Sequence, residues 1–313
     1  MKRHAPVFVV LGSSALTRIC MEEILQAGCR VAALVSTPSG QRQLDSMDLK
    51  GFCRRKGITY RKWRDLNSAQ GNRLLLSYRS DYILSTWPYL LSAKTLKIPR
   101  EMVIGSHPTA LPQNRGRHPL YWLLCLGLPE SKMSFFQMDA GVDHGAILSQ
   151  TRFRVHLSRP LAATVDSMNV AARKGIRRVL GKIRVGRLRG RAQNHAQTNF
   201  WRKRTIHDVL LDPRMDHQLV LRTVRSFASP CPGAVLAWEK KAIRVLSARV
   251  LPKPAGFARM EFGRILSVRG RRMKLRMGNA LLELTLKQAL PPALRGSKHL
   301  HPPSYYLRPD FEG

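Results

Sequence analysis

The residues best suited to chemistry lie between positions 102 and 148, where His107 is followed 36 positions later by Asp143. An imidazole can act as a general base near neutral pH, and a carboxylate beside it can orient the ring and tune its charge. Because Pro108 cannot continue a strand's hydrogen-bonding ladder, we expect His107 to end a strand over 102–108. A second strand is expected to deliver Asp143. A histidine beside a proline is also a common turn residue.

A second candidate group is the segment NRGRHP at 114–119. Arg115 and Arg117 flank Gly116, whose lack of a side chain permits close approach of the backbone. Two guanidinium groups can bind a phosphate or a carboxylate through paired hydrogen bonds. A solvated loop is the alternative interpretation.

The charge balance favours an anionic partner. The 313 residues include 54 Lys and Arg against 19 Asp and Glu, a formal net charge of +35. Such an excess creates positive potential over much of the surface. Nucleic acid, a nucleotide-linked substrate and a polyglutamylated folate would all satisfy it. The strongest local excess of positive charge is at 151–204, with fifteen Lys or Arg and one acidic residue, Asp166. A solvent-exposed helix face would show the same excess.

The five cysteines are scattered and show no spacing typical of a metal site or a disulfide framework: Cys20, Cys29, Cys53, Cys125 and Cys231. We therefore expect a reducing, cytoplasmic location and no metal. The apolar run near the N-terminus is too short for a signal peptide and indicates a first strand. No apolar stretch approaches the roughly 18 residues that a membrane span needs.

Alternating strand and helix patterns must position these residues. Apolar strand-like runs at 7–14, 30–37 and 81–87 alternate with helical patterns at 15–27 and 48–58. This alternation predicts a parallel sheet with helices on its faces, a Rossmann-like domain. The first strand is not followed by GxGxxG, so no dinucleotide is expected, and Gly12 is expected to make a tight turn.

The second half of the chain has a different pattern. One amphipathic helix is predicted over 161–186, and short strands with glycine turns after a helix near 216 predict a small β-barrel that hides its strand edges. We predict four segments: a catalytic domain at 1–190, a linker at 191–208, a small C-terminal barrel domain at 209–295 and an irregular tail at 296–313.

The segments HPTALPQNRGRHP and MDAGVDHGAIL resemble the signature of the folate-dependent formyltransferases, which include amino-sugar N-formyltransferases and methionyl-tRNA formyltransferase. The resemblance covers roughly residues 5–290. It implies an α/β fold, with a Rossmann-like parallel-sheet formyltransferase domain followed by a small OB-like β-barrel. It also implies an enzyme that moves a formyl group from 10-formyltetrahydrofolate to an amine, with His107 as the base and Asp143 as its partner.

The resemblance also implies binding residues. In the family, the loop after the fourth strand holds the pterin through backbone groups, although Trp87 and Tyr89 could equally be core aromatics. The residues expected to contact the formyl donor are Ser85, Thr86, Trp87, Pro88, Tyr89, Leu90, Met138, Asp139, Ala140, Gly141 and Val142. The residues expected to contact the acceptor are Arg115, Gly116, Arg117, Trp201 and Arg204.

One departure from the family pattern affects catalysis. The family has Asn-x-His where this chain has Gly105, Ser106 and His107. We expect Gly105 to leave space for a water or a substrate group and the activity to be impaired. The motifs WPYLL and RGRHP resemble the amino-sugar members and predict a nucleotide-linked amino sugar as acceptor. The alternatives are a methionyl-tRNA formyltransferase, which the basic stretch favours, and a catalytically silent binding protein, which Gly105 favours.

Overall fold

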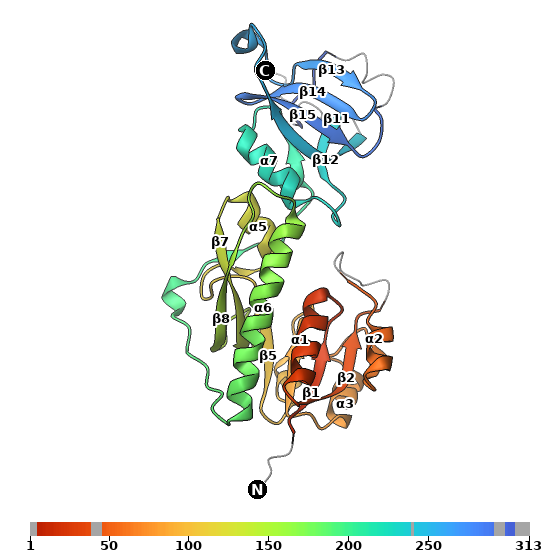
Figure 1. The fold of residues 1–313 in the computed structure, drawn as a ribbon, viewed down its shortest axis with the longest axis vertical. Coiled ribbons are helices and arrows are strands. Elements are labelled where there is room, and N and C mark those ends of the chain that lie inside the picture. Colours follow the sequence, from red (N-terminus) through yellow and green to blue (C-terminus); the bar gives the residue numbers. More distant parts are fainter. Residues whose placement is uncertain (1–4, 39–45, 239–240, 291–297, 304–313) are drawn as a thin grey trace. The chain divides into compact units, whose positions relative to one another are not determined.

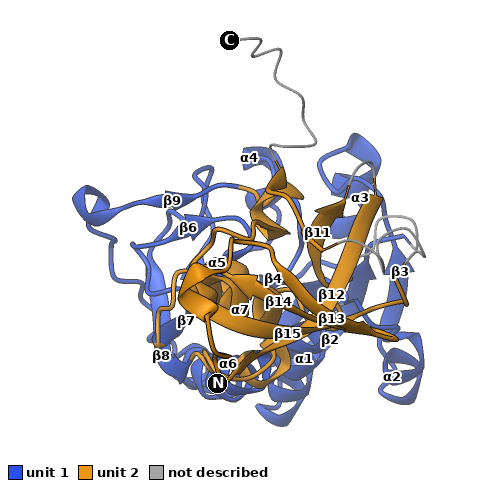
Figure 2. Ribbon diagram, turned by 90° about the horizontal axis from the view of Figure 1, so that it is seen from above, with its two compact units in different colours: residues 1–119, 130–154, 165–202 blue, residues 120–129, 155–164, 203–313 orange. Residues whose placement is uncertain are grey.

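The computed structural model describes residues 5–38, 46–238, 241–290 and 298–303 (Figure 1). The chain forms two compact units (Figure 2). Unit 1 comprises residues 1–119, 130–154 and 165–202, and unit 2 comprises residues 120–129, 155–164 and 203–313. The last ten residues of the predicted tail lie outside the described residues.

Unit 1 is built on a seven-stranded sheet in the order β3-β2-β1-β4-β5-β7-β8. Neighbouring strands are parallel from β3 to β5, whereas β5–β7 and β7–β8 are antiparallel pairs. The strands are β1 (Val7–Leu11), β2 (Arg30–Ser36), β3 (Thr59–Lys62), β4 (Tyr82–Ser85), β5 (Met102–His107), β7 (Glu130–Gln137) and β8 (Ile147–Arg154). The predicted Rossmann-like sheet is confirmed.

The helices of unit 1 are α1 (Ala15–Gln26), α2 (Lys50–Arg55), α3 (Ala69–Ser77), α4 (Ala93–Leu96) and most of α6 (Leu161–Arg184). Three of them, α1, α3 and α4, begin at capping serines. At the start of α1, the Ser14 side chain accepts a hydrogen bond from the Thr17 backbone, and Thr17 accepts one from Ser14 in return. Gly12 precedes this cap at a φ of +142°, and a side chain there would collide with Thr86. Only glycine therefore fits at this position of the predicted tight turn.

Helix α6 lies along β7 and β8 (Figure 1). Its buried stripe recurs at helical spacing through Ala172, Ile176, Val179 and Ile183, as the sequence predicted. Gly175 permits the close approach to the sheet, because a Cβ there would lie 3.0 Å from the Phe135 ring. The apolar face of α6 thus closes unit 1 over its antiparallel strands, and the basic face remains in solvent.

Unit 2 contains helix α7 (His217–Ser226), most of α5 (Pro119–Cys125) and a six-stranded sheet in the order β10-β11-β12-β15-β14-β13. Every neighbouring pair is antiparallel except β10–β11. The strands are β10 (Leu210–Leu211), β11 (Ala234–Trp238), β12 (Lys241–Leu251), β13 (Ile265–Arg269), β14 (Arg272–Met277) and β15 (Ala280–Leu286). The predicted second domain of short strands is confirmed.

The segment predicted as a linker contains ordered short elements. Residues 195–197 form a 3₁₀ turn, and β9 (Phe200–Trp201) pairs in parallel with β6 (Arg115–Gly116). Up to residue 202 the segment belongs to unit 1, where it lies against the loop that follows β5. Hydrogen bonds to this loop, which leave no periodic pattern in the sequence, hold the segment in place.

Candidate active site

His107 lies at the C-terminal end of β5, and its side chain is 7% exposed. Its Nε2 is 3.0 Å from the Asn114 carbonyl oxygen, and its Nδ1 is 3.5 Å from Oδ2 of Asp143. Because a carbonyl can only accept, Nε2 carries the hydrogen of this bond and Nδ1 is left facing the carboxylate. The structure therefore brings the predicted pair together, with Nδ1 as the nitrogen that can exchange a proton.

Asp143 lies in the loop between β7 and β8, so the prediction that a strand delivers it was wrong. The pairing of β7 stops at Gln137 because the chain turns there, and a side chain on Gly145 would collide with the Gln137 carbonyl. Asp143 itself has a φ of +48°, in the left-handed region that a residue with a side chain rarely adopts. Its Oδ2 accepts a hydrogen bond of 2.9 Å from the Gly116 amide.

Gly116 connects the Asp143 loop to β9. Its φ is +108°, and a Cβ at this position would collide with the Trp201 carbonyl. Glycine is therefore required for the 114–118 loop to lie against β9 while its amide reaches Asp143. Trp201, a predicted acceptor contact, is placed in this pairing.

Arg115 is the most buried charged group near the pair, with 3% of its surface exposed. Its Nη2 donates to Oε1 of Gln193 at 2.6 Å and to Nδ1 of His195 at 3.0 Å, whereas its Nε has no partner among the described residues. Burial lowers the pKa of Arg115, and the nearby carboxylates of Asp143 and Asp139 oppose that shift. The guanidinium of Arg115 is thus already engaged inside the protein.

Gln193 and His195 were missed at the sequence level. Both lie in the segment without periodicity, where no motif marks them. His195 stacks on His144 with ring centroids 4.0 Å apart, and Nδ1 of His144 is 2.6 Å from Asp139. Desolvation lowers the pKa of His195, and the neighbouring His144 and Arg115 lower it further. A chain of polar side chains therefore connects the 139–144 loop to Arg115.

The loop after β4 places its predicted residues in two environments. Ser85 and Thr86 bond within the sheet, and Trp87 packs on the core of unit 1. The tip is exposed, with Tyr89 and Leu90 at 40% and 65% exposure. Nη1 of Arg117, the exposed arginine of the RGR motif, donates to the Pro88 carbonyl at 3.0 Å and so connects this loop to the 114–118 loop.

The 138–142 turn is anchored at one end and open at the other. Met138 donates its amide to the Val103 carbonyl at 2.8 Å and packs on the core, whereas Val142 is 38% exposed. Between them, Oδ1 of Asp139 accepts the Gly141 amide at 3.0 Å, and Ala140 is exposed. Apolar side chains and loop backbone therefore face solvent close to Asp143.

The expected space beside Gly105 does not exist. A Cβ built on Gly105 would lie 2.7 Å from Cγ of Met138 and 2.8 Å from the Phe136 ring. These two side chains fill the volume that the family asparagine would need, so the prediction of a gap for water or substrate was wrong.

Arg204, predicted to contact the acceptor, belongs to unit 2. Its guanidinium lies over the rings of Phe227 and Tyr121, with its central carbon 4.1 Å and 5.3 Å from their centroids. Cation–π contacts of this kind fix an arginine on aromatic faces.

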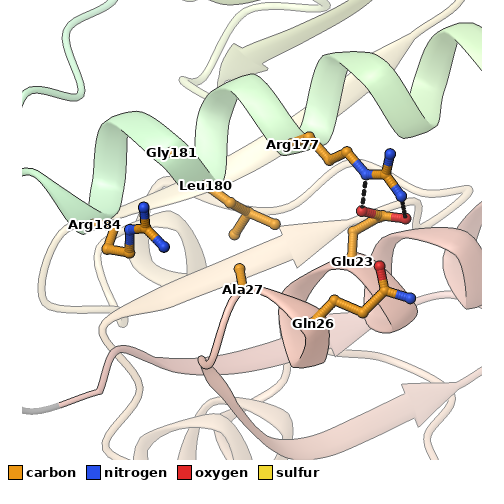
Figure 3. Close-up of a pocket in the computed structure, with 7 residues that line it drawn as sticks. All are labelled: Glu23, Gln26, Ala27, Arg177, Leu180, Gly181 and Arg184. Carbon is orange, nitrogen blue, oxygen red and sulfur yellow. Dashed lines mark hydrogen bonds and ion pairs between the residues drawn. The ribbon is translucent and has the colours of Figure 1, made fainter.

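A separate groove lies between α1 and α6, away from the His107 and Asp143 pair (Figure 3). Its lining residues are Glu23, Gln26, Ala27, Arg177, Leu180, Gly181 and Arg184. Its carboxylate, Glu23, is fully used by Arg177 and Arg173. We therefore place the chemistry at the end of β5, where an imidazole and a carboxylate meet.

Two further features bear on the class of site. Within the described residues, no three His, Cys, Asp or Glu side chains gather as metal ligands. Over the same ranges, no helix combines the length and the apolarity needed to cross a membrane.

Unit 1 is a Rossmann-like domain in which a histidine and a carboxylate lie close together beyond a strand end. Residues 7–180 match the family model described as formyl transferase, and residues 207–291 match the formyl transferase C-terminal domain. The chain belongs to the formyl transferase family, and the transfer of a formyl group is its reaction.

The proteins similar to this chain include a methionyl-tRNA formyltransferase and an N-formyltransferase solved with a nucleotide-linked amino sugar. The methionyl-tRNA formyltransferase of Acidithiobacillus ferrooxidans is 28% identical over 248 residues, covering 78% of this chain and 79% of that protein. An N-formyltransferase from Helicobacter canadensis, solved with folinic acid and dTDP-3-aminofucose, has a TM-score of 0.66 and 12% identity over 89% of this chain and 98% of that one.

HypX from Aquifex aeolicus, solved with tetrahydrofolic acid, has a TM-score of 0.66 and 15% identity. The match covers 93% of this chain and 46% of HypX, so the chain spans less than half the length of that protein. At these identities, the two structural likenesses support the fold alone.

Proposed function

We propose that the protein transfers the formyl group of 10-formyltetrahydrofolate to the primary amine of an anionic acceptor, and that the acceptor is a nucleotide-linked amino sugar. The observation that carries the proposal is the His107 and Asp143 pair at the end of β5, with Nδ1 of His107 3.5 Å from the carboxylate. Formyl-tetrahydrofolate is the formyl donor of this family.

The chemistry of the nearby groups fits this formyl donor. Tyr89, Leu90 and Val142 are apolar and exposed next to loop backbone, which suits a flat heterocycle with a hydrogen-bonding edge. We therefore propose that the 85–90 loop and the 138–142 turn hold the pterin. When bound, 10-formyltetrahydrofolate supplies an activated formyl group.

The catalytic residues then act on the acceptor amine. Nδ1 of His107 takes the amine proton, because Nε2 is committed to the Asn114 carbonyl. Asp143 stabilises the imidazolium that forms, and the Gly116 amide holds that carboxylate in place. Because Arg115 is engaged internally, Arg117 is the arginine of the loop that we assign to the acceptor's anionic group.

A methionyl-tRNA acceptor is the second candidate, and two observations favour it. The curated relative at 28% identity is a methionyl-tRNA formyltransferase, and the chain carries a net charge of +35. Phosphate contacts dominate the affinity of proteins for nucleic acid, so a surface this basic would bind tRNA.

Single-turnover assays with radiolabelled formyl donor decide between the acceptors. We expect formylation of a nucleotide-linked amino sugar, with a rate that falls roughly 10²–10⁴-fold in His107→Ala because the general base is lost. Formylation of methionyl-tRNA alone would move the acceptor to the second candidate. No formylation of either acceptor, with folded protein and bound folate, would support the catalytically silent alternative.

The Gly105 position tests whether the enzyme is impaired. Gly105→Asn alone should not raise the rate, because Met138 and Phe136 occupy the space. With Met138→Ala and Phe136→Leu added to make room, the asparagine can supply a missing hydrogen bond, which typically accounts for about 10²–10³-fold. If the triple variant folds, binds the formyl donor and gains nothing over the Met138→Ala, Phe136→Leu control, another group already supplies that hydrogen bond.

The five cysteines are free thiols, in keeping with the proposed cytoplasmic location.

A further inference from the structure

The amide of Gln193 bridges the Asp143 loop to a buried arginine. Its side chain is buried, with 6% of the residue exposed. Nε2 donates to the Asp143 carbonyl at 2.9 Å and to the Gly145 carbonyl at 2.7 Å, while Oε1 accepts from Nη2 of Arg115 at 2.6 Å. Every polar atom of the amide is therefore used.

This arrangement permits only one orientation of the amide. Two carbonyl oxygens can only accept, and a guanidinium can only donate, so Nε2 must face the loop and Oε1 must face Arg115. A carboxylate at position 193 would satisfy Arg115 with one oxygen but turn the other, which can only accept, toward two carbonyls. An apolar side chain would remove the hydrogen bonds to both carbonyls and leave Nη2 of Arg115 with His195 alone.

The loop needs such a restraint because its backbone is strained. Asp143 has a φ of +48°, a left-handed backbone conformation that a residue with a side chain keeps only where its surroundings hold it. The two bonds from Gln193 bind the carbonyls of residues 143 and 145, which both lie on the C-terminal side of this position. They fix the peptide groups that follow Asp143 and so restrain where its carboxylate lies.

We propose that Gln193 is a positioning residue, which holds the carboxylate of Asp143 against His107 by binding the loop carbonyls to the buried Arg115. The inference deepens the proposed function, in which Asp143 stabilises the imidazolium of His107. It also gives a role to the buried charge of Arg115, which orients the Gln193 amide.

The first experiment is independent of activity. Amide hydrogen exchange is followed by NMR at Gly116, whose N–H binds Asp143, and at Met138, whose N–H binds the sheet at Val103. In Gln193→Glu the Gly116 amide should exchange roughly three- to tenfold faster, the change that one net hydrogen bond gives, while Met138 is unchanged. The matched control is Gln197→Glu, an exposed glutamine four positions further along the chain.

The second experiment measures formyl transfer. Gln193→Glu should lower kcat/KM roughly 10²-fold, as small misplacements of catalytic groups do. In an Asp143→Ala background the same substitution should add little, because both act through one carboxylate. A parent without activity would count against the proposed function, while the exchange experiment would still test Gln193.

Three outcomes would overturn the proposal. One is unchanged exchange at Gly116 in Gln193→Glu, and another is a kinetic loss that adds fully to that of Asp143→Ala. If Gln193→Glu does not fold, Gln193→Met is measured by the same two readouts. Failure of both variants to fold would show that Gln193 holds the whole of unit 1 together, which also contradicts a role confined to Asp143.

Discussion

Two buried charged side chains in unit 1, Glu23 and Arg115, differ in how their charge is compensated. Glu23 on α1 is 2% exposed and ion-pairs with Arg177 (Figure 3) and with Arg173, both on α6. Burial alone would raise the pKa of Glu23, but the hydrogen bonds from these two arginines outweigh it and lower that pKa. The charge is thus compensated by groups that themselves reach solvent.

Arg115 is equally buried, at 3% exposed, but its hydrogen-bond partners Gln193 and His195 are neutral and its Nε has none. Desolvating a charge costs several kcal/mol. For Arg115 the neutral hydrogen-bond partners offset this less than a direct ion pair would, and the carboxylates of Asp143 and Asp139 act on it without a hydrogen bond. Buried, poorly compensated charges gather at functional sites more often than elsewhere. Under the proposal for Gln193, the Glu23 cluster stabilises the fold, whereas the Arg115 cluster positions Asp143.

The largest effect is expected for Arg115→Met. Methionine fills much of the same volume without a charge, so the free energy of unfolding should stay unchanged or rise, as for other buried ionic groups replaced by apolar ones. Because Gln193 loses its anchor, kcat/KM should fall roughly 10²-fold. Thermal unfolding and single-turnover kinetics measure the two effects, with exposed Arg187→Met as the control. If Arg115→Met lowers the free energy of unfolding as strongly as it lowers kcat/KM, the Glu23 and Arg115 clusters do not differ in role.

The opposite result is expected for Glu23→Gln. The neutral amide cannot pair with both arginines, and an unmade hydrogen bond of a buried group costs about 1–3 kcal/mol of unfolding free energy. Formyl transfer per folded molecule should be unchanged.

The stability that Glu23 gives the parent depends on pH. Because the pKa of Glu23 in the folded protein is lowered from 4.5, the unfolded chain binds the proton more readily, so the parent loses this stability as pH falls below about 4.5.

Denaturant unfolding at neutral and acid pH tests this prediction. The stability of parent and Glu23→Gln should converge in acid, where the carboxylate no longer contributes. Curves that stay parallel across this pH range would mean that Glu23 is not the source of the difference.

The sequence predicted the strand that carries the base but not the way its partner is held. His107 followed from an apolar run ended by Pro108, because local chain chemistry decides where a strand stops. Asp143 was predicted as part of the pair, yet its loop conformation depends on Gly116 and Gln193, which are 27 and 50 positions away. Hydrogen bonds at such separations leave no periodicity, so the segment 191–202 resembled a linker.

The two arginines of the RGR motif show the same limit. Composition could not distinguish Arg115 from Arg117, because both flank Gly116 in an apparently polar loop. The structure distinguishes the two arginines, because the parallel pairing of β6 with β9 buries Arg115 and leaves Arg117 exposed. A binding role read from the motif alone therefore had to cover both residues.

The smallest effect is expected from the protonation of His195, at the outer end of the Arg115 cluster. Its Nδ1 accepts from Arg115 and its ring stacks on His144, so a proton on His195 meets a guanidinium at 3.0 Å and a second imidazole, with only Asp139 opposing. Desolvation, and then the contacts with His144 and Arg115, lower the pKa of His195 from 6.5, so the unfolded chain binds the proton more readily than the folded one.

Stability from neutral His195 is therefore present above pH 6.5 and is lost as pH falls below it. Because His195 is exposed, solvent and salt screen the effect, and we expect only a slightly steeper fall in Tm below pH 6.5 for the parent than for His195→Gln. The glutamine can still accept from Arg115 but does not titrate. His207→Gln, at an exposed histidine of unit 2, should keep the parent's slope. Equal slopes for the parent and His195→Gln would remove His195 from the cluster and leave Gln193 as the sole neutral group that the charge of Arg115 orients.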